Sequence, residues 1–417
     1  MSLATQRRRQ CTRDVRHVMQ EPHRDTPERR DWTKLLPDLV AEIAGRLLGV
    51  DLTEYIRFRA VCKPWRQLTD DPRGLNSRFF PRNWVMLSNY GEGTRRRLLN
   101  VATGASIVDL DLPELAGHHP LGYAEGLLVL WNTTTYAIRL FNSLTRAVTD
   151  LPDFSSIIYD LTNASGVAMD MYGFGGFGVI DGAASPPTVV VFLHGKVPVL
   201  ACIRLGEPHW ALVDTSELSA GGAGKMSSLS ALSLHGRFYL STSMGDVLTL
   251  ELHPAPRLVY VIRQTTTVAA ATLPPVRCSF FLAPSSDDDG RRMLMVRFSQ
   301  DDDHTEVAVF DVDVDGRRLV PTSTVGAGRA LFVGSLRTLS VSTTLFPSIA
   351  ASDNAVYFCH GHGPGDKLFS VFYIDSGRDE TALELEFFDQ MDGPFFGPFN
   401  LDVYLAYCVD LVLGAMI

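Results

Sequence analysis

Cysteine is scarce in this chain of 417 residues, and no two of its cysteines form a C-x-x-C pair. The spacing therefore matches neither a disulfide framework nor a zinc-binding signature, and it favours a reducing compartment. The six cysteines are Cys11, Cys62, Cys202, Cys278, Cys359 and Cys408.

Long apolar runs and an excess of positive charge are also missing. No window approaches the ~18 uninterrupted apolar residues of a membrane-spanning helix, and the N-terminus lacks the apolar region of a secretory signal. The formal charge is −9 and the pI is near 5.7, so the chain as a whole is not attracted to nucleic acid or anionic membranes. We therefore expect a cytoplasmic or nuclear protein.

Three regions differ in composition. Residues 1–32 are rich in arginine and contain almost no apolar residue, which predicts a disordered basic tail. Residues 33–72 have the apolar spacing of helices. Residues 80–417 consist of short alternating runs separated by turn residues, which predicts a large all-β domain.

The stretch "LPDLVAEIAGRL", residues 36–47, predicts an amphipathic helix. Pro37 suits the first helical turn, and Asp38 lies at the positive end of the helix dipole. Gly49 is expected to end this helix, and Asp51 with Glu54 resembles a capping box that starts the next one. Pro64 should bend or shorten the last helix.

The all-β region contains weak internal repeats. "LGYAEGLLVL", "LSLHGRFYLS" and "IAASDNAVYF" each place a turn with Gly, Asp or Asn before a strand, and "HGRFYLSTSMGDVLTL" reads as a hairpin that turns near Gly245. At ~40 to 50 residues per four-stranded blade, the region would hold six to eight blades of a β-propeller. A pair of β-sandwiches would account for the strands less well.

The helical segment resembles the F-box. "LLPDLVAEIAGRL" followed by "DLTEYIRFRAVCKPWR" contains the Leu-Pro start and the Val-Cys…Trp-Arg end of that motif at the expected separation. The resemblance implies that apolar side chains bind a Skp-type adaptor. The implied adaptor-binding residues are Leu36, Pro37, Leu39, Ile43, Leu47, Val61, Cys62 and Trp65.

The β region resembles a plant family of F-box proteins that carry domain of unknown function 295. The resemblance rests on "ALFVGSLRTLSVSTTLFPSIAASDNAVYF", residues 330–358, and on "IRLFNSLTRAVTDLP", in which Ser143 and Arg146 replace the usual proline and glycine. It implies a substrate receptor of a Skp-cullin-F-box (SCF) ubiquitin ligase, whose propeller binds a target protein for ubiquitin-dependent degradation. Catalysis would belong to other subunits, so no catalytic residue, metal or cofactor is expected.

Other interpretations remain open at this stage. The same helical residues could form only the core of a small subdomain, and Trp65 could pack that subdomain onto the propeller. A DNA-binding helix-turn-helix would need a denser basic face than residues 35–68 provide. The chain could also be an enzyme with a site in the propeller channel, or a scaffold whose F-box has lost adaptor binding.

Three stretches imitate chemical sites. "GFGGFG", residues 173–178, satisfies G-x-G-x-x-G, but no helix follows, so we expect a flexible loop or turn. "CHGHGPGD", residues 359–366, is too tightly spaced for a zinc site and is expected to be an exposed turn. The acidic runs 287–289 and 301–303 lack the ligand spacing of a calcium loop and are expected to be solvated.

Overall fold

The computed structural model describes the chain from residue 31 to residue 384, with gaps. The basic tail expected over residues 1–32 lies almost entirely outside the described residues. The described ranges are 31–87, 94–132, 134–165, 174–181, 186–193, 198–216, 230–264, 277–285, 292–300, 305–334, 337–346, 354–363 and 366–384.

A small helical unit precedes the β region. Helix α1 begins at Pro37, as predicted, but it continues through Gly49 to Val50, where Asp51 adopts an extended conformation. Pro64 lies in the first turn of a separate short helix, where proline is tolerated. The elements are η1 (Trp32–Lys34), α1 (Pro37–Val50), α2 (Leu52–Val61), α3 (Lys63–Gln67) and η2 (Ser77–Phe79).

The β region is a propeller of six blades, within the predicted range of six to eight. Every strand-like stretch named by its periodicity contains a strand, because alternating apolar residues suit a sheet that packs on its neighbours. The first three blades are β1 (Trp84–Leu87), β2 (Arg95–Asn100), β3 (Ser106–Asp111); β4 (His119–Ala124), β5 (Leu127–Trp131), β6 (Ile138–Asn142), β7 (Ala147–Asp150); and β8 (Phe174–Ile180), β9 (Thr188–Leu193), β10 (Val199–Arg204), β11 (Ala211–Leu212).

Blades four and five repeat this antiparallel pattern, whereas the sixth blade has five strands in the order β21-β20-β22-β23-β24, with β20 parallel to β22. Their strands are β12 (Ser230–Leu234), β13 (Arg237–Ser241), β14 (Val247–Glu251), β15 (Arg257–Ile262); β16 (Arg277–Pro284), β17 (Met293–Gln300), β18 (Thr305–Asp313), β19 (Arg318–Thr322); and β20 (Arg329–Val333), β21 (Leu339–Ser342), β22 (Ala355–Gly363), β23 (Asp366–Tyr373), β24 (Arg378–Glu384).

Alternate residues of the middle strands face opposite neighbouring blades. On β9, Val189 and Val191 join the apolar cluster shared with the second blade, and Val190 and Phe192 join the cluster shared with the fourth. Because both faces of such a strand are covered, it reads as a continuous apolar run. Each of the six pairs of neighbouring blades shares one such cluster.

The ring closes between the sixth and first blades. Val85 and Leu99 pack in one cluster with Phe332 and Tyr357. The guanidinium of Arg337 donates to the backbone oxygen of Arg82 at 2.9 Å. The first and last blades are therefore joined by apolar packing together with a hydrogen bond to the entry segment.

The repeated turn seen in the sequence has a common geometry. Glu125 and Gly126 between β4 and β5 both have positive φ, at 51° and 88°, and His235 and Gly236 between β12 and β13 have φ of 50° and 71°. Two consecutive residues with positive φ produce the tight turn whose twist matches that of a hairpin. The predicted β13–β14 hairpin is also present, with Gly245 at φ 80° in its turn.

The glycine-rich stretch "GFGGFG" is not the expected loop. Residues 174–180 form β8, which is buried along most of its length. A Cβ atom on Gly176 would overlap the side chain of Ala231, and one on Gly178 would overlap the ring of Phe238. The glycines therefore allow the third and fourth blades to approach closely.

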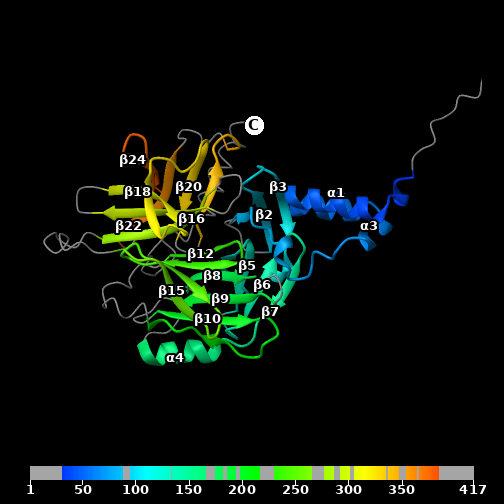
Figure 1. The fold of residues 1–417 in the computed structure, drawn as a ribbon, viewed down its shortest axis with the longest axis horizontal. Coiled ribbons are helices and arrows are strands. Elements are labelled where there is room, and N and C mark those ends of the chain that lie inside the picture. The colour runs from blue at the N-terminus through cyan, green and yellow to red at the C-terminus, as the bar shows by residue number, and fades with distance from the viewer. Residues whose placement is uncertain are drawn as a thin grey trace, which may run out of the picture.

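The helices lie at the edges of the propeller. Figure 1 shows α1 projecting from one side beside β2 and β3, while α4 (Ser155–Ser165) lies along another edge near β10. Ile157 and Ile158 of α4 pack into the cluster between the second and third blades. Among the described residues, no helix has the length and hydropathy needed to cross a bilayer.

Candidate functional site

Helix α1 has two adjacent apolar faces, and only one of them is buried. Val40 and Ala44 lie in the core of the helical unit. Leu36, Leu39 and Ile43 remain 66%, 47% and 37% exposed. At about 100° per residue Leu39, Ile43 and exposed Val50 fall within an arc of about 40° beside the buried face, and Leu36 immediately precedes them at the N-cap of the helix. We call these four residues the α1 stripe.

The core of the helical unit explains why the stripe is left outside. Tyr55 and Phe58 of α2 pack against the buried face of α1, and Phe79 of η2 closes the same cluster. With these rings packed against the other face, the α1 stripe stays outside the core of the helical unit. The cluster consists of Val40, Ala44, Leu52, Tyr55, Phe58 and Phe79, with Leu35, Leu47, Leu48, Ile56, Trp65 and Leu144 packed around it.

The other predicted adaptor residues divide between surface and interior. Pro37 is exposed at the start of α1, and Val61 is 65% exposed at the end of α2. Leu47 and Cys62 are half-buried. Trp65 stacks on Phe58, with ring centroids 4.4 Å apart, and its indole N–H donates to the carbonyl oxygen of Trp32.

The structure thus groups the predicted residues in one helical unit but gives them different environments. Leu36, Pro37, Leu39, Ile43 and Val61 are available to a partner. Leu47 and Trp65 mainly hold the unit together, and the alternative in which Trp65 packs the unit onto the propeller does not match its contacts with Phe58 and Trp32.

Sequence reasoning missed three exposed apolar residues of this unit. Trp32, Val50 and Leu68 are 61%, 65% and 44% exposed. The apolar spacing of α1 includes Val50, but the expectation that Gly49 ends the helix excludes it. Trp32 lies outside the three helices, where periodicity gives no information, and Leu68 continues the apolar spacing of the helices but lies just after the end of α3.

Exposed apolar side chains concentrate in the helical unit. In the described part of the chain, seven of the thirteen large apolar residues that remain exposed lie between Trp32 and Leu68. The other six are scattered over the propeller and α4, as is normal for a protein surface. An apolar concentration in so short a segment is typical of an interaction site.

Charged groups flank the α1 stripe without interrupting it. Glu42 and Arg46 form an ion pair of 2.8 Å on the exposed side of α1, one turn apart. Glu54 pairs with Arg57 on α2 at 2.5 Å. Because these charges neutralise one another, apolar contact rather than net charge dominates the chemistry of the surface.

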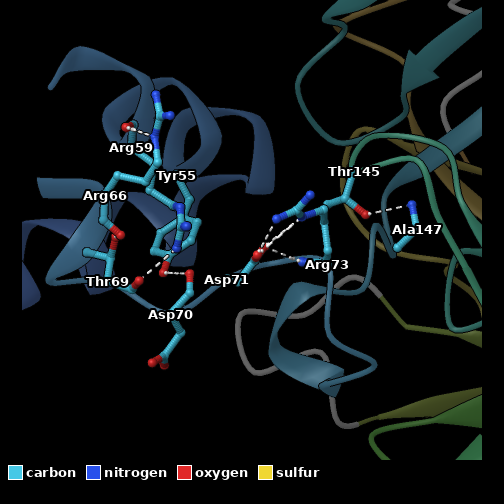
Figure 2. A network of polar contacts seen from close by, with 9 residues as sticks. All are labelled: Tyr55, Arg59, Arg66, Thr69, Asp70, Asp71, Arg73, Thr145 and Ala147. Atoms are coloured by element: carbon cyan, nitrogen blue, oxygen red, sulfur yellow. Dashed lines mark hydrogen bonds and ion pairs between the residues drawn. The ribbon is translucent and has the colours of Figure 1, made fainter. Parts of the chain in front are cut away.

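The segment that leaves the helical unit is held against α2 by polar contacts (Figure 2). The hydroxyl of Tyr55 donates to the carbonyl oxygen of Asp70 at 2.9 Å, and Arg59 donates to that of Thr69 at 2.8 Å. Hydrogen bonds from Arg73 lower the pKa of the Asp71 carboxyl to about 2, and burial raises the pKa of Tyr55. Thr69 and Asp70 are therefore held against α2, and Asp71 and Arg73 form a local ion pair in the segment that follows.

The stretches that imitate chemical sites show no site within the described residues. The strand β22 extends through Gly363, so the stretch "CHGHGPGD" is not mainly an exposed turn as expected, because its first residues pair with β23. The acidic runs 287–289 and 301–303 lie outside the described residues. Within the described ranges, no three metal-binding side chains gather.

Comparison with known proteins identifies the family of the propeller. No curated protein matches the sequence. One solved structure that resembles the chain is described as an oligogalacturonate lyase in complex with manganese. It is 8% identical, covers 78% of this chain and 79% of its own, and has a TM-score of 0.34.

The sequence profile described as KIB1-4 beta-propeller matches residues 98–382. That span contains most of the propeller described above and begins after the helical unit. The match covers more than half of the chain and agrees with the propeller fold. The chain therefore belongs to the KIB1-4 β-propeller family.

Proposed function

We propose that this protein is the substrate-recognition subunit of an SCF-type ubiquitin ligase. The helical unit binds a Skp-type adaptor, and through it a cullin-RING ligase, while the propeller binds the protein to be ubiquitinated. The chain acts as a binding protein in the cytoplasm or nucleus, and catalysis belongs to other subunits. The concentration of exposed apolar side chains in the helical unit carries this proposal.

The α1 stripe has the form that helix-in-groove binding requires. Residues one turn apart on one face of a helix can enter the apolar groove of a partner together. Burying apolar surface in such a groove yields about 25 cal/mol per Å². Leu39 and Ile43 are exposed on a helix that the core already orders, and Leu36 is exposed at its N-cap, so binding them has a low entropic cost.

The resemblance to the F-box supports the choice of adaptor. The Leu-Pro start of that motif lies at the exposed beginning of α1, and its Val-Cys end lies at the junction of α2 and α3. Membership of a β-propeller family supports a protein-binding role for the remainder of the chain.

Co-purification with a Skp-type adaptor tests the proposal. The full chain should bind, and Leu39→Glu and Val61→Glu should each weaken binding at least about tenfold, because a buried unpaired charge costs more than 1.4 kcal/mol. Both substitutions are at exposed positions, so the helical unit should stay folded. The matched control is Val108→Glu on β3, which is 66% exposed and lies outside the helical unit.

Two results would contradict the proposal. If the folded wild-type chain does not bind any Skp-type adaptor, the protein is a scaffold or regulatory binding protein with a vestigial F-box. If Val108→Glu weakens binding as much as Leu39→Glu does, the adaptor contacts a different surface.

A further inference from the structure

Asp51 lies between the helical unit and the propeller and binds both. Its Oδ1 atom accepts the backbone N–H of Thr53 at 2.7 Å, as well as the hydroxyl of Thr53, and so caps the start of α2. Its Oδ2 atom accepts the indole N–H of Trp84 at 2.9 Å and the side-chain amide of Asn100 at 2.6 Å. Trp84 and Asn100 belong to β1 and β2 of the first blade.

The two propeller groups that meet Asp51 are buried, and the first blade itself orients one of them. Trp84 is 3% exposed and Asn100 1% exposed. The amide oxygen of Asn100 accepts the backbone N–H groups of Ala102 and Thr103, so its NH₂ group must point toward Asp51. Two buried donors therefore meet one carboxylate oxygen, and these charge-assisted hydrogen bonds specify both the distance and the direction of the contact.

An apolar contact supports the same junction. Leu144, in the turn between β6 and β7, packs against the core of the helical unit, and Phe79 is part of that core. The side-chain amide of Asn142 donates to the carbonyl oxygen of Phe79 at 3.0 Å. The junction thus combines apolar packing with directional hydrogen bonds at Asn142 and at Asp51.

We propose that Asp51 is a positioning residue that holds the helical unit in one orientation on the first blade. Apolar packing alone does not specify an angle, since it is not directional, whereas the contacts of Asp51 do. The consequence for ubiquitination rests on the proposed function: a fixed orientation sets the distance between the adaptor on α1 and the target on the propeller.

A capping role alone would not explain the second pair of contacts. Asp51→Asn separates the two roles, because its amide oxygen still caps α2 while its NH₂ group faces the donors of Trp84 and Asn100. Asp153 provides a matched control. It accepts the backbone N–H and the hydroxyl of Ser155 at the start of α4 in a similar local pattern, and no bond joins it to another element among the described residues.

Distance measurement between two spin labels tests the proposal. p-Acetylphenylalanine at positions 46 and 148 carries a nitroxide to exposed sites on α1 and β7 without altering the native cysteines. The full chain should show one narrow distance. Asp51→Asn should broaden this distribution or add a second distance, and Asp153→Asn should leave it unchanged.

A second variant keeps the test valid if Asp51→Asn does not fold. Trp84→Phe removes one of the two donors on the propeller side, leaves the cap of α2 intact, and should also broaden the distribution. Narrow distributions in the folded variants would overturn the proposal.

Adaptor binding, measured in parallel, should survive in both variants. If even the wild-type chain fails to bind adaptor, the proposed function fails while the distance result still decides the role of Asp51.

Discussion

The Nε atom of Arg82 lies 2.5 Å from the Oε2 atom of Glu125, an ion pair whose acidic side chain is only 3% exposed. The hydroxyl of Ser233 donates to the other oxygen of the same carboxylate at 3.0 Å. Arg82 ends the segment that connects the helical unit to the propeller, Glu125 belongs to the second blade and Ser233 to the fourth. One carboxylate therefore anchors the entry segment to two blades.

Glu125→Gln is expected to lower the free energy of unfolding by about 1–3 kcal/mol, because it removes a buried charge that two donors require. Chemical denaturation of the purified chain measures this change. Glu207→Gln is the matched control, since Glu207 pairs with Arg204 at 3.9 Å on the surface and should cost less than about 0.5 kcal/mol. Equal effects of the two substitutions would show that the burial of the Glu125 carboxylate adds nothing to the free energy of unfolding.

Gly126→Ala is expected to destabilise the protein more than Gly206→Ala. Both glycines have positive φ, 88° and 94°, so each alanine has the backbone strain of about 1–2 kcal/mol. At Gly126 the new Cβ would also overlap the carbonyl oxygen of Pro81, whereas at Gly206 it meets open space. Thermal unfolding of the two variants isolates the steric contribution, and the same Tm for both would contradict it.

Leu36→Ala combined with Pro37→Ala is expected to abolish adaptor binding and to leave the unfolding transition of the propeller unchanged. Leu36 is exposed and precedes α1, so its truncation creates no cavity. Calorimetry and adaptor co-purification on the same preparation provide the two readouts. Unfolding of the whole chain by this double substitution would mean that the residues serve the core instead.

Cys202 is expected to resist thiol reagents in the folded protein. Burial in the cluster between the third and fourth blades, together with the charge of Glu207, raises the pKa of this thiol from 9.0 to about 11. Only the thiolate reacts, so the half-buried Cys62 and Cys278 should be modified first at pH 8. Mass spectrometry after brief alkylation identifies the order, and early modification of Cys202 would contradict its burial.

The same pKa predicts how stability depends on pH. Because the folded state keeps the thiol of Cys202 protonated above its ordinary pKa of 9.0, the stabilisation is complete below pH 9 and is lost as pH rises toward about 11. Denaturation series between pH 8 and 11 should show a shallower decline for Cys202→Ala than for the wild-type chain. Parallel declines would contradict this assignment.

The glycine-rich stretch shows where local reasoning stops. "GFGGFG" has the composition of a loop, and nothing within a few residues reveals that Gly176 and Gly178 lie in a buried strand. The requirement for glycine comes from Ala231 and Phe238, more than fifty residues later in the chain. A close approach between blades leaves no periodic signal, so the error could not be corrected from sequence alone.

The candidate site also combines features that the sequence predicts with features that only the structure shows. The periodicity of residues 36–47 predicts an apolar face on α1, but it does not distinguish Val40, which is buried, from Leu39, which is exposed. That distinction depends on where Tyr55 and Phe58 of the next helix pack. Core and interface use the same side chains, so only their neighbours separate the two.

The sequence by itself determined that a short helical segment with a Leu-Pro start precedes a β-propeller built from alternating strands and turns. These features depend on backbone preferences and on local periodicity, which neighbouring residues define. Only the tertiary structure decided the number of blades, the closure of the ring through Val85 and Phe332, and the bonds from Asp51 to Trp84 and Asn100. These contacts join residues far apart in the chain, and the free energy that selects them comes from burial and directional hydrogen bonds, which exist only once the blades have assembled.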